Sequence, residues 1–352
     1  MSIDNLKFSN FIEADQLYKE NKLGLVKTPL LEASISTKNI KIFYKNDYKL
    51  LTNSFKIRGA YVAILNQLRA SAQLDAGLNS GLNSGLNGHR GVVTRSAGNF
   101  AQAVAFIAKN LDLKCKIVMP EKAPKIKINK TASYGAEIHL RPTREEEDNL
   151  VSEIAKNEGF IKLHPFNMLD VIYGQSICAF EILEQFREGD KERKIDYLFG
   201  PIGGGGFMAG VSEVFKKLSP DTKLIAVEPS GGDDFYRSFH AKKLTRLESV
   251  NTIADGLISP VVGENPWSYL KENIDQAIVV SDDQIIQSMR EYYQETGDML
   301  EPSGAVARAG AISFFNQLAS KNGDSDRKTI NVIVLNCGGN IESDRFLELT
   351  KL

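Results

Sequence analysis

From Gly91 onward the chain alternates short apolar segments with longer amphipathic ones, and this alternation constrains the fold more than any other feature. The short segments are typical of buried strands, and the longer ones have helical spacing. Such repetition predicts an α/β fold with parallel sheets and helices on both faces. The number of expected strands favours two open, twisted sheets over one. We expect strands at 40–44, 92–93, 115–119, 137–140, 160–163, 197–199, 224–227, 278–280 and 332–335, and helices at 60–74, 101–110, 124–134, 144–157, 171–186 and 207–218.

Composition indicates a soluble globular protein. Of the 352 residues, 42% are hydrophobic and 25% charged, and the formal net charge is −1. A charge so near zero gives no electrostatic bias toward nucleic acid or an anionic membrane. No apolar run approaches the roughly 18 residues that a membrane span needs, and the first residues lack the pattern of a secretory signal. We therefore expect a cytoplasmic protein.

Cysteine and histidine usage argues against disulfides and against a metal site built on these residues. Cys115, Cys178 and Cys337 are far apart and odd in number, and the four histidines show no metal-ligand spacing. Residues 1–36 are expected to form a helix-bearing arm that ends in an extended segment at Thr28-Pro29-Leu30. Residues 77–88 repeat Gly-Leu-Asn-Ser, which is too short a unit to stack as a solenoid, so we expect a flexible surface insertion.

One lysine, Lys56, lies in the stretch Ser54-Phe55-Lys56-Ile57-Arg58-Gly59-Ala60, between a predicted strand and a predicted helix. A partly desolvated lysine loses proton affinity, and its neutral amine can then form a Schiff base with a carbonyl compound. The alternative is an ordinary solvated lysine near a helix start.

A run of four glycines, Gly203 to Gly206, follows the predicted strand at 197–199 and precedes the predicted helix at 207–218. Four glycines bring several backbone N–H groups together at a helix N-terminus without side chains in the way, which favours a phosphate-binding loop. The run is not G-x-G-x-x-G, and no G-K-[ST] follows, so neither a dinucleotide nor a nucleoside triphosphate is favoured. The alternative is a flexible turn.

Two further segments lie at the carboxyl ends of predicted strands, where ligands bind in open α/β sheets. Ser96-Ala97-Gly98-Asn99-Phe100 offers backbone donors and the Ser96 hydroxyl to a carboxylate, and the Asn99 amide to a phenolate-like oxygen. An ordinary helix cap is the alternative. Cys337, in Cys337-Gly338-Gly339-Asn340, is either a buried packing residue or an uncharged partner for a heterocyclic nitrogen.

The ordered set of the Lys56 stretch, Ser96-x-Gly98-Asn99, the tetraglycine loop and the terminal Cys337-Gly338-Gly339-Asn340 resembles the threonine/serine dehydratases. These are pyridoxal 5′-phosphate (PLP) enzymes of the tryptophan-synthase β fold, PLP fold type II, which also includes serine racemase. The resemblance extends from about Pro29 to Asn340. Each motif is unspecific by itself, but the ordered set is specific.

The resemblance implies a role for each residue. Lys56 carries the cofactor as a Schiff base, and Phe55 packs against the pyridine ring. Asn99 binds the ring hydroxyl, and Gly203, Gly204, Gly205 and Gly206 bind the phosphate. Cys337 faces the ring nitrogen, where many relatives have serine. A carboxylate there would keep the nitrogen protonated, whereas an uncharged thiol would not, so negative charge is expected to stay near Cα and favour β-elimination.

The resemblance also implies the reaction. The freed Lys56 amine removes the Cα proton, the β-hydroxyl leaves with a proton from the cofactor phosphate, and hydrolysis gives a 2-keto acid and ammonia. Substrate is expected to contact Ser96, Ala97, Gly98, Asn99 and Phe100. Racemase-like relatives have a second serine where this chain has Ala97, which argues against racemisation.

A divalent-cation site is implied as well. Glu228-Pro229-Ser230-Gly231-Gly232-Asp233-Asp234 matches the cation loop of serine racemase and related dehydratases. The matching ligands are Glu228, Asp234 and the Gly232 carbonyl, all hard oxygens suited to Mg²⁺ or Ca²⁺. The alternative is a solvated acidic loop.

The main departure from the family is Phe100, where relatives usually have a histidine beside the substrate carboxylate. Phenylalanine removes a donor and adds apolar bulk, which leaves a larger β-hydroxy amino acid open as substrate. The segments His164-Pro165-Phe166-Asn167 and Gly174-Gln175-Ser176 also keep the family pattern only in part.

Together these features predict a PLP-dependent ammonia-lyase with a small-molecule amino-acid substrate, and a homodimer, as is common in the family. We expect a large PLP-binding domain of residues 1–68 and 169–352, and a small domain of residues 69–168 that closes over the substrate. Nothing resembling a C-terminal regulatory module follows Asn340, which argues against a feedback-regulated biosynthetic enzyme. A PLP-dependent racemase, a β-replacement enzyme and a binding protein without turnover remain the rivals.

Overall fold

The computed structural model describes residues 3–21, 23–37, 39–78, 91–321 and 329–352. The chain forms two compact units, a smaller one of residues 1–25 and 56–174 and a larger one of residues 26–55 and 175–352. The predicted division into domains at 68/69 and 168/169 stays a prediction. The chain passes from the larger unit to the smaller unit between Phe55 and Lys56, and it returns to the larger unit between Gly174 and Gln175.

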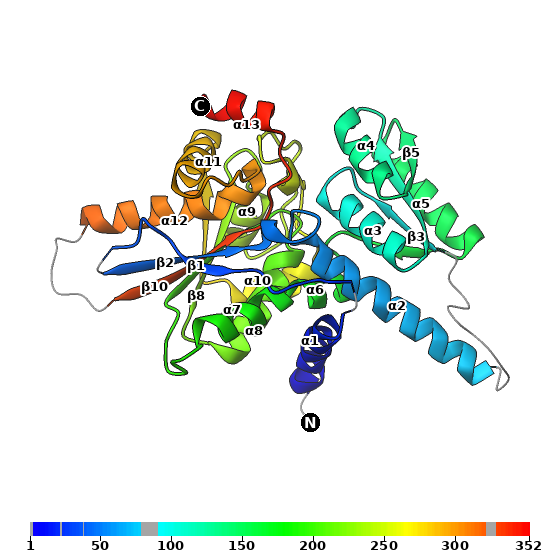
Figure 1. Ribbon diagram of the computed structural model, residues 1–352, viewed down its shortest axis with the longest axis horizontal. Coiled ribbons are helices and arrows are strands. Elements are labelled where there is room, and N and C mark those ends of the chain that lie inside the picture. The colour runs from blue at the N-terminus through cyan, green and yellow to red at the C-terminus, as the bar shows by residue number, and fades with distance from the viewer. Residues whose placement is uncertain (1–2, 22, 38, 79–90, 322–328) are drawn as a thin grey trace. The chain divides into compact units, whose positions relative to one another are not determined.

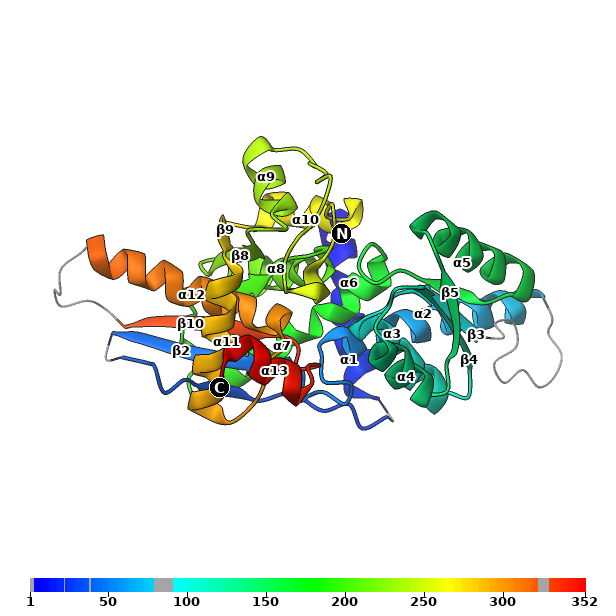
Figure 2. The same ribbon diagram turned by 90° about the horizontal axis from the view of Figure 1, so that it is seen from above.

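Parallel strands form the sheet of the smaller unit. Helices α3 (Asn99–Asn110) and α4 (Lys125–Ser133) lie on one face and α5 (Arg144–Glu158) on the other (Figure 2). A sheet covered on both faces requires apolar strands, and the central strand β3 is buried along most of its length. The strand order is β5 (Glu137–Arg141), β4 (Lys114–Pro120), β3 (Gly91–Arg95) and β6 (Ile161–Leu163).

Among the described residues, this unit also contains the helices α1 (Ile3–Lys19), α2 (Lys56–Leu78) and α6 (Leu169–Gln175). The first turn of α2 is fixed by packing. Arg58 is fully buried, and its guanidinium lies 5.3 Å from the centroid of the Tyr18 ring. Gly174 of α6 packs on the same turn so closely that a Cβ there would lie 2.6 Å from the Arg58 carbonyl oxygen.

The larger unit contains a mixed sheet. Its edge strand β1 (Leu30–Glu32) runs antiparallel to β2 (Ile40–Asn46), and the remaining neighbours are parallel. The order is β1, β2, β10 (Ile330–Asn336), β7 (Tyr197–Pro201), β8 (Lys223–Pro229) and β9 (Gln276–Val280).

Helices cover both faces of this sheet. Figure 1 shows α11 (Asp282–Thr296), α12 (Pro302–Lys321) and α13 (Ser343–Thr350), in orange to red, on one side, and α7 (Ile177–Phe186) and α8 (Gly206–Leu218), in green, on the other. The remaining elements are α9 (Asp234–Ala241), α10 (Glu264–Asn273) and the short 3₁₀ helices η1 (Asp47–Lys49) and η2 (Asp255–Leu257).

The core of the larger unit lies between α12 and the sheet. Val332, Ile333 and Val334 of β10 are fully buried, and each such side chain contributes about 1.5–3 kcal/mol to folding as an upper estimate. Gly310 allows α12 to approach β8, because a Cβ there would lie 2.6 Å from Val227 Cγ2. α12 therefore packs closely against β8 of the sheet.

The predicted α/β fold with two sheets and flanking helices is confirmed, and each predicted strand is present. One helix prediction is wrong: residues 171–186 form two helices, α6 and α7, separated at Ser176. The break lies next to the boundary between the two compact units, which falls between Gly174 and Gln175. Residues 79–88 of the predicted repeat insertion at 77–88 lie outside the described residues. Among the described residues, no helix combines the length and hydropathy of a membrane span.

Candidate functional site

The segment before Lys56 is held against the end of β10. The Phe55 amide donates to the Cys337 carbonyl at 3.0 Å, and Ser54 forms an isolated antiparallel bridge with Gly338. Lys56 follows directly and is the first residue of α2. The backbone therefore brings the residue before the predicted Schiff-base lysine to the predicted ring-nitrogen partner.

The Phe55 ring is nearly buried and stacks on Phe207, with centroids 4.1 Å apart and planes inclined by 23°. Phe207 lies in the first turn of α8, directly after the tetraglycine loop. Within the larger unit, this stack connects the predicted ring-packing residue to the predicted phosphate-binding loop.

Packing requires glycine in the tetraglycine loop. Gly205 has φ +88°, and a Cβ there would lie 2.9 Å from Pro266 Cβ and 3.0 Å from Val262 Cγ1. At Gly203 a Cβ would lie 2.8 Å from Leu257 Cα. With no side chains, the amides at the start of the 13-residue helix α8 are left for an anion, which the helix dipole favours. The loop therefore fits a phosphate group.

In the smaller unit, Ser96–Phe100 connects β3 to α3, as predicted. The Gly98 amide donates to Ser96 Oγ at 3.3 Å, and a Cβ on Gly98 would meet no atom within 4 Å. Phe100 is 2% exposed and so belongs to the core of α3. The loop is thus an open helix N-terminus backed by the apolar ring of Phe100.

His164, at the end of β6 in the same unit, is a structural histidine. Its Nδ1 accepts a hydrogen bond from the Asn167 amide at 2.9 Å, which shapes the turn through Pro165. Burial first, and the neighbouring Arg95 second, lower the pKa of His164 to about 4. It is therefore neutral at physiological pH.

Cys337 lies at the carboxyl end of β10 and is 2% exposed. Its Sγ donates to the Ser303 carbonyl at 3.6 Å, and Ser303 Oγ accepts a bond from the Gly256 amide at 2.8 Å. Like Cys115 and Cys178, it is buried and forms no disulfide. Its position, rather than its burial, makes it a candidate for cofactor contact.

The predicted cation ligands lie at the end of β8 and the start of α9. Glu228 accepts hydrogen bonds from the amides of Phe235 at 3.1 Å and Tyr236 at 2.7 Å. Burial first, and Asp234 second, raise its pKa well above the usual range. Neither oxygen of the buried Asp234 carboxylate forms a hydrogen bond within the described part of the chain.

Burial also raises the pKa of Asp234 to about 7; the amides of Val262 and of Asp234 itself lie near the carboxylate without meeting hydrogen-bond geometry and lower the pKa only in part. Two acids whose charges are suppressed by burial fit a hard cation that would neutralise both. No group of three or more His, Cys, Asp or Glu suited to a metal occurs among the described residues, so a site here would depend on backbone or water oxygens such as the Gly232 carbonyl.

Comparison with known proteins identifies the family. The model of the family described as "Pyridoxal-phosphate dependent enzyme" matches residues 22–338. The chain belongs to this family of PLP-dependent enzymes.

Individual relatives span more than one reaction. The chain is 33% identical over 314 residues to "Threonine dehydratase 2 biosynthetic, chloroplastic" of Solanum lycopersicum, covering 89% of this chain but 48% of that protein. It is 32% identical over 329 residues to "L-threo-3-hydroxyaspartate ammonia-lyase" of Saccharomyces cerevisiae, covering 92% and 90%. The structure of maize serine racemase aligns with TM-score 0.81 and 29% identity over 97% of this chain and 95% of that one. The resemblance and the PLP fold type II class inferred from the sequence are confirmed.

For a PLP-dependent enzyme, the larger unit brings together the predicted contacts Phe55, Gly203–Gly206 and Cys337, and the smaller unit contains Lys56 and Ser96–Phe100. Their roles stay predictions. The sequence analysis missed Glu301, a buried carboxylate beside Gly338. Its signal was Glu301-Pro302-Ser303-Gly304 at the start of a long helix, a pattern that an ordinary helix start also has.

Proposed function

We propose that this PLP-dependent enzyme is an ammonia-lyase, which converts a β-hydroxy amino acid such as L-threonine or L-serine into a 2-keto acid and ammonia. The observation that carries the proposal is the 3.0 Å hydrogen bond from the Phe55 amide to the Cys337 carbonyl. It holds the residue before Lys56 against the backbone of Cys337, the predicted partner of the ring nitrogen, whose side chain is an uncharged thiol rather than a carboxylate. Relatives named as a threonine dehydratase and an ammonia-lyase support the same reaction class.

The residues of the chain would hold the cofactor as follows. Lys56 Nζ would bind it covalently, the amides of Gly203–Gly206 would bind its phosphate, and Phe55 would pack on its ring. Asn99 would bind the ring hydroxyl, and Cys337 would face the ring nitrogen. When bound, PLP supplies an electron sink that stabilises negative charge at Cα.

Two parts of the chain then act on the substrate. Lys56 Nζ, once it is a free amine, accepts the Cα proton, since a neutral amine can act as a general base. Ser96 Oγ and the amides at the start of α3 bind and orient the substrate carboxylate. Ala97 offers no hydroxyl from which a proton could return to Cα, which disfavours racemisation.

Phe100 supports a second candidate, a 3-hydroxy amino acid bulkier than threonine. Its buried ring offers no hydrogen-bond donor beside the Ser96–Asn99 loop, so carboxylate recognition would depend more on backbone amides. The yeast relative is named for 3-hydroxyaspartate, so that compound belongs among the substrates tested.

The proposal includes a divalent cation. Glu228, Asp234 and the Gly232 carbonyl would hold Mg²⁺ or Ca²⁺, and the cation would stabilise the loop rather than act on substrate. The two buried carboxylates with raised pKa values support this assignment. Isothermal titration of metal-free protein with each cation tests it, and absence of binding together with unchanged stability would remove the site.

The proposal further includes a cytoplasmic homodimer and a small domain that closes over the substrate, as the resemblance implies. Sedimentation equilibrium measures the oligomeric state, and a monomer at micromolar concentration would contradict it. Fractionation of the source cells tests the compartment.

An absorption spectrum of the purified protein, followed by titration with L-threonine, L-serine and 3-hydroxyaspartate, tests the proposed function. We expect a cofactor band that is absent in Lys56→Ala, and release of 2-keto acid from one of the substrates. A band without turnover of any β-hydroxy amino acid would favour racemisation, β-replacement or binding alone. Formation of the D-isomer or capture of an added thiol distinguishes the first two. No band after reconstitution with PLP would refute the proposal.

A further inference from the structure

The turn that contains Cys337 is held along one edge by the chain before Lys56. The Phe55 amide donates to the Cys337 carbonyl at 3.0 Å, and the Gly339 amide donates to the Asn53 carbonyl at 2.9 Å. These two bonds join backbone to backbone. They fix the path of the turn but do not by themselves determine what packs against it from the rest of the larger unit.

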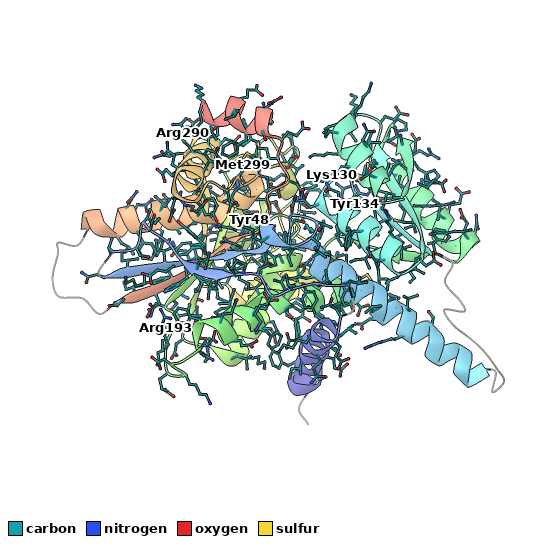
Figure 3. The ribbon with its side chains drawn as sticks, viewed as in Figure 1. Tyr48, Lys130, Tyr134, Arg193, Arg290 and Met299 are labelled. Carbon is teal, nitrogen blue, oxygen red and sulfur yellow. The ribbon has the colours of Figure 1, made fainter. Side chains whose placement is uncertain are left out.

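The Tyr48 ring packs directly on this turn. A Cβ added to Gly339 would lie 3.3 Å from Tyr48 Cβ and 3.1 Å from the Met299 carbonyl oxygen, so Gly339 fits tightly between these two residues, which Figure 3 labels. Tyr48 is 7% exposed and belongs to the hydrophobic core of the larger unit. Because protein interiors are close-packed, a shift of this ring would be transmitted to the turn.

A chain of hydrogen bonds holds the Tyr48 ring in place. Its hydroxyl donates to Asp298 Oδ2 at 2.8 Å and lies 2.9 Å from the Tyr292 hydroxyl. Tyr292 donates to Asn46 Oδ1 at 3.2 Å, and the Asn336 amide donates to the same oxygen at 3.1 Å. Asn336 directly precedes the turn, and Tyr48 packs on its far end. The chain of bonds therefore supports the turn at both ends.

This chain of bonds is built into the sheet. Asn46 and Asn336 are paired in register across the parallel strands β2 and β10, so their side chains lie on the same face. Asn46 is 3% exposed, and Asn336 and Tyr292 are fully buried. Polar groups at such depth are costly unless they are hydrogen-bonded, so these side chains have a strong preference for the observed arrangement.

The groups that lie nearest the turn in this chain are neutral. Burial raises the pKa of both Tyr48 and Tyr292, so each remains an uncharged hydroxyl. The Asp298 carboxylate, at the outer end, is paired with Lys49 Nζ at 2.6 Å, and these two side chains are 37% and 44% exposed. The chain of bonds thus adds no net charge, in keeping with the uncharged thiol of Cys337 at the proposed ring-nitrogen position.

We propose that Tyr48 and Tyr292 are positioning residues for the cofactor: their linked hydroxyls hold the turn so that the Cys337 side chain faces the ring of the bound cofactor. The inference rests on the proposed function, which assigns Cys337 to the ring nitrogen. Both tyrosines act through the turn rather than on the substrate. Loss of either hydroxyl should tilt the cofactor ring without loosening its phosphate, which the separate loop Gly203–Gly206 would hold.

The test uses the PLP-loaded holoenzyme and the variants Tyr48→Phe and Tyr292→Phe, each of which removes a hydroxyl and keeps the ring. The visible circular dichroism of the bound cofactor reports the orientation of its ring, and the ³¹P resonance reports its phosphate. We expect both variants to alter the amplitude of the circular dichroism band per bound PLP and to leave the ³¹P resonance unchanged. PLP binding should weaken by about two- to tenfold, the net contribution of one hydrogen bond.

Tyr44→Phe is the matched control for a loss of stability alone. Tyr44 is 2% exposed and packs edge-on against Tyr292 with centroids 5.3 Å apart, but its hydroxyl bonds to Glu295 and Arg308 instead. Its loss removes an acceptor from the buried Arg308 guanidinium. Tyr44→Phe should therefore lower the unfolding free energy at least as much as Tyr292→Phe, while the circular dichroism and the PLP affinity stay those of the wild type.

Two substitutions of Asp298 separate hydrogen bonding from charge. The amide oxygen in Asp298→Asn can still accept from the Tyr48 hydroxyl, whereas Asp298→Ala offers no acceptor. We expect the wild-type circular dichroism in Asp298→Asn and a change like that of Tyr48→Phe in Asp298→Ala. A change in Asp298→Asn as large as that in Asp298→Ala would assign the effect to charge and refute the positioning role.

The outcomes separate the two levels of inference. Circular dichroism and PLP affinity equal to the wild type in Tyr48→Phe and Tyr292→Phe would refute the positioning role while the ammonia-lyase proposal stands. Equal changes in Tyr44→Phe would also refute it, because they would then follow from lost stability alone. The expected responses in a holoenzyme that releases no 2-keto acid would support the positioning role and refute the proposed reaction. Failure of the wild type to bind PLP would refute the proposed function and, with it, the cofactor role of the turn.

Discussion

Gly205 adopts φ +88° at the start of α8, and its missing Cβ leaves room for Pro266 and Val262. Gly205→Ala therefore introduces both an unfavourable backbone conformation, about 1–2 kcal/mol, and a steric clash. We expect an unfolding free energy lower by about 2 kcal/mol or more and a PLP affinity at least about tenfold weaker. Urea denaturation and fluorescence titration with PLP measure the two effects.

Gly189 provides the matched control, because it has φ +81° but a Cβ added there would meet no atom within 4 Å. Gly189→Ala should lose only the backbone contribution and bind PLP as the wild type does. Equal effects of the two substitutions would show that the tetraglycine loop is a turn without a role in phosphate binding.

At Asp234, burial raises the pKa from 3.8 in the unfolded chain to about 7 in the fold. A raised pKa means that the folded state holds the proton more tightly, so the stability is fully present below pH 4 and is lost as the pH rises through 7. The unfolding free energy is measured at pH 5 and pH 8 in the absence of divalent cations. Between these pH values we expect it to fall in the wild type by on the order of a few kcal/mol more than in Asp234→Asn.

A divalent cation binds the deprotonated carboxylates and should reverse this loss. Addition of Mg²⁺ or Ca²⁺ at pH 8 should therefore stabilise the wild type and leave Asp234→Asn unchanged, as measured by urea denaturation. Equal stabilisation of both proteins would locate the cation elsewhere.

At the scale of elements, a buried ion pair joins β2 to α7. Lys45 Nζ lies 2.6 Å from Glu181 Oε2 and also donates to the Thr28 carbonyl and Gln185 Oε1, with the two charged side chains 0% and 5% exposed. Lys45→Met leaves the Glu181 carboxylate buried without its cation, which costs about 3–5 kcal/mol.

Lys41, on the same strand, pairs with Glu32 at 2.7 Å, but these side chains are 38% and 44% exposed. Lys41→Met should therefore change the unfolding free energy by less than about 1 kcal/mol. Chemical denaturation measures the unfolding free energy of both single variants and of Lys45→Met/Glu181→Leu. The double variant should recover much of the unfolding free energy that Lys45→Met loses. Equal effects at Lys45 and Lys41 would contradict the buried-pair interpretation.

The strands were predictable because their apolar runs, such as Val332–Leu335, are buried on both faces, and burial leaves a pattern in the sequence. The separation of α6 from α7 was not predictable, because Val171–Phe186 has continuous helical spacing, and the break coincides with a boundary between compact units that leaves no local pattern. β1 was expected only as extended chain, since three residues at a sheet edge carry little periodicity.

Within the candidate site, the sequence located the loops but not their contacts. The Phe55–Phe207 stack and the Phe55–Cys337 hydrogen bond join residues that are far apart in the chain, so no local pattern encodes them. Glu301 was missed for the same reason: its burial depends on Gly338, and a carboxylate before Pro302 is also what an exposed helix start would have.

At the scale of the whole molecule, the proposed cofactor contacts belong to both units, since Phe55 ends one segment of the larger unit and Lys56 begins one of the smaller. A ligand that binds only the folded state adds about 2.7 kcal/mol of stability at a concentration 100 times its Kd. With the contacts proposed above, phosphate at Gly203–Gly206 would stabilise the larger unit, and the covalent bond at Lys56 would extend the effect to α2. Cofactor binding should therefore slow amide exchange in both places.

Lys56→Ala separates the two contributions. Hydrogen exchange of apoprotein and PLP-loaded protein should show slower exchange in the wild type both at Gly203–Phe207 and in the first turns of α2. In Lys56→Ala the glycine loop should still be protected at saturating PLP, whereas α2 should exchange as in the apoprotein, because the covalent bond is gone. If α2 is protected in Lys56→Ala as strongly as in the wild type, another residue binds the cofactor there. If the glycine loop loses its protection in Lys56→Ala, the phosphate does not bind at the start of α8.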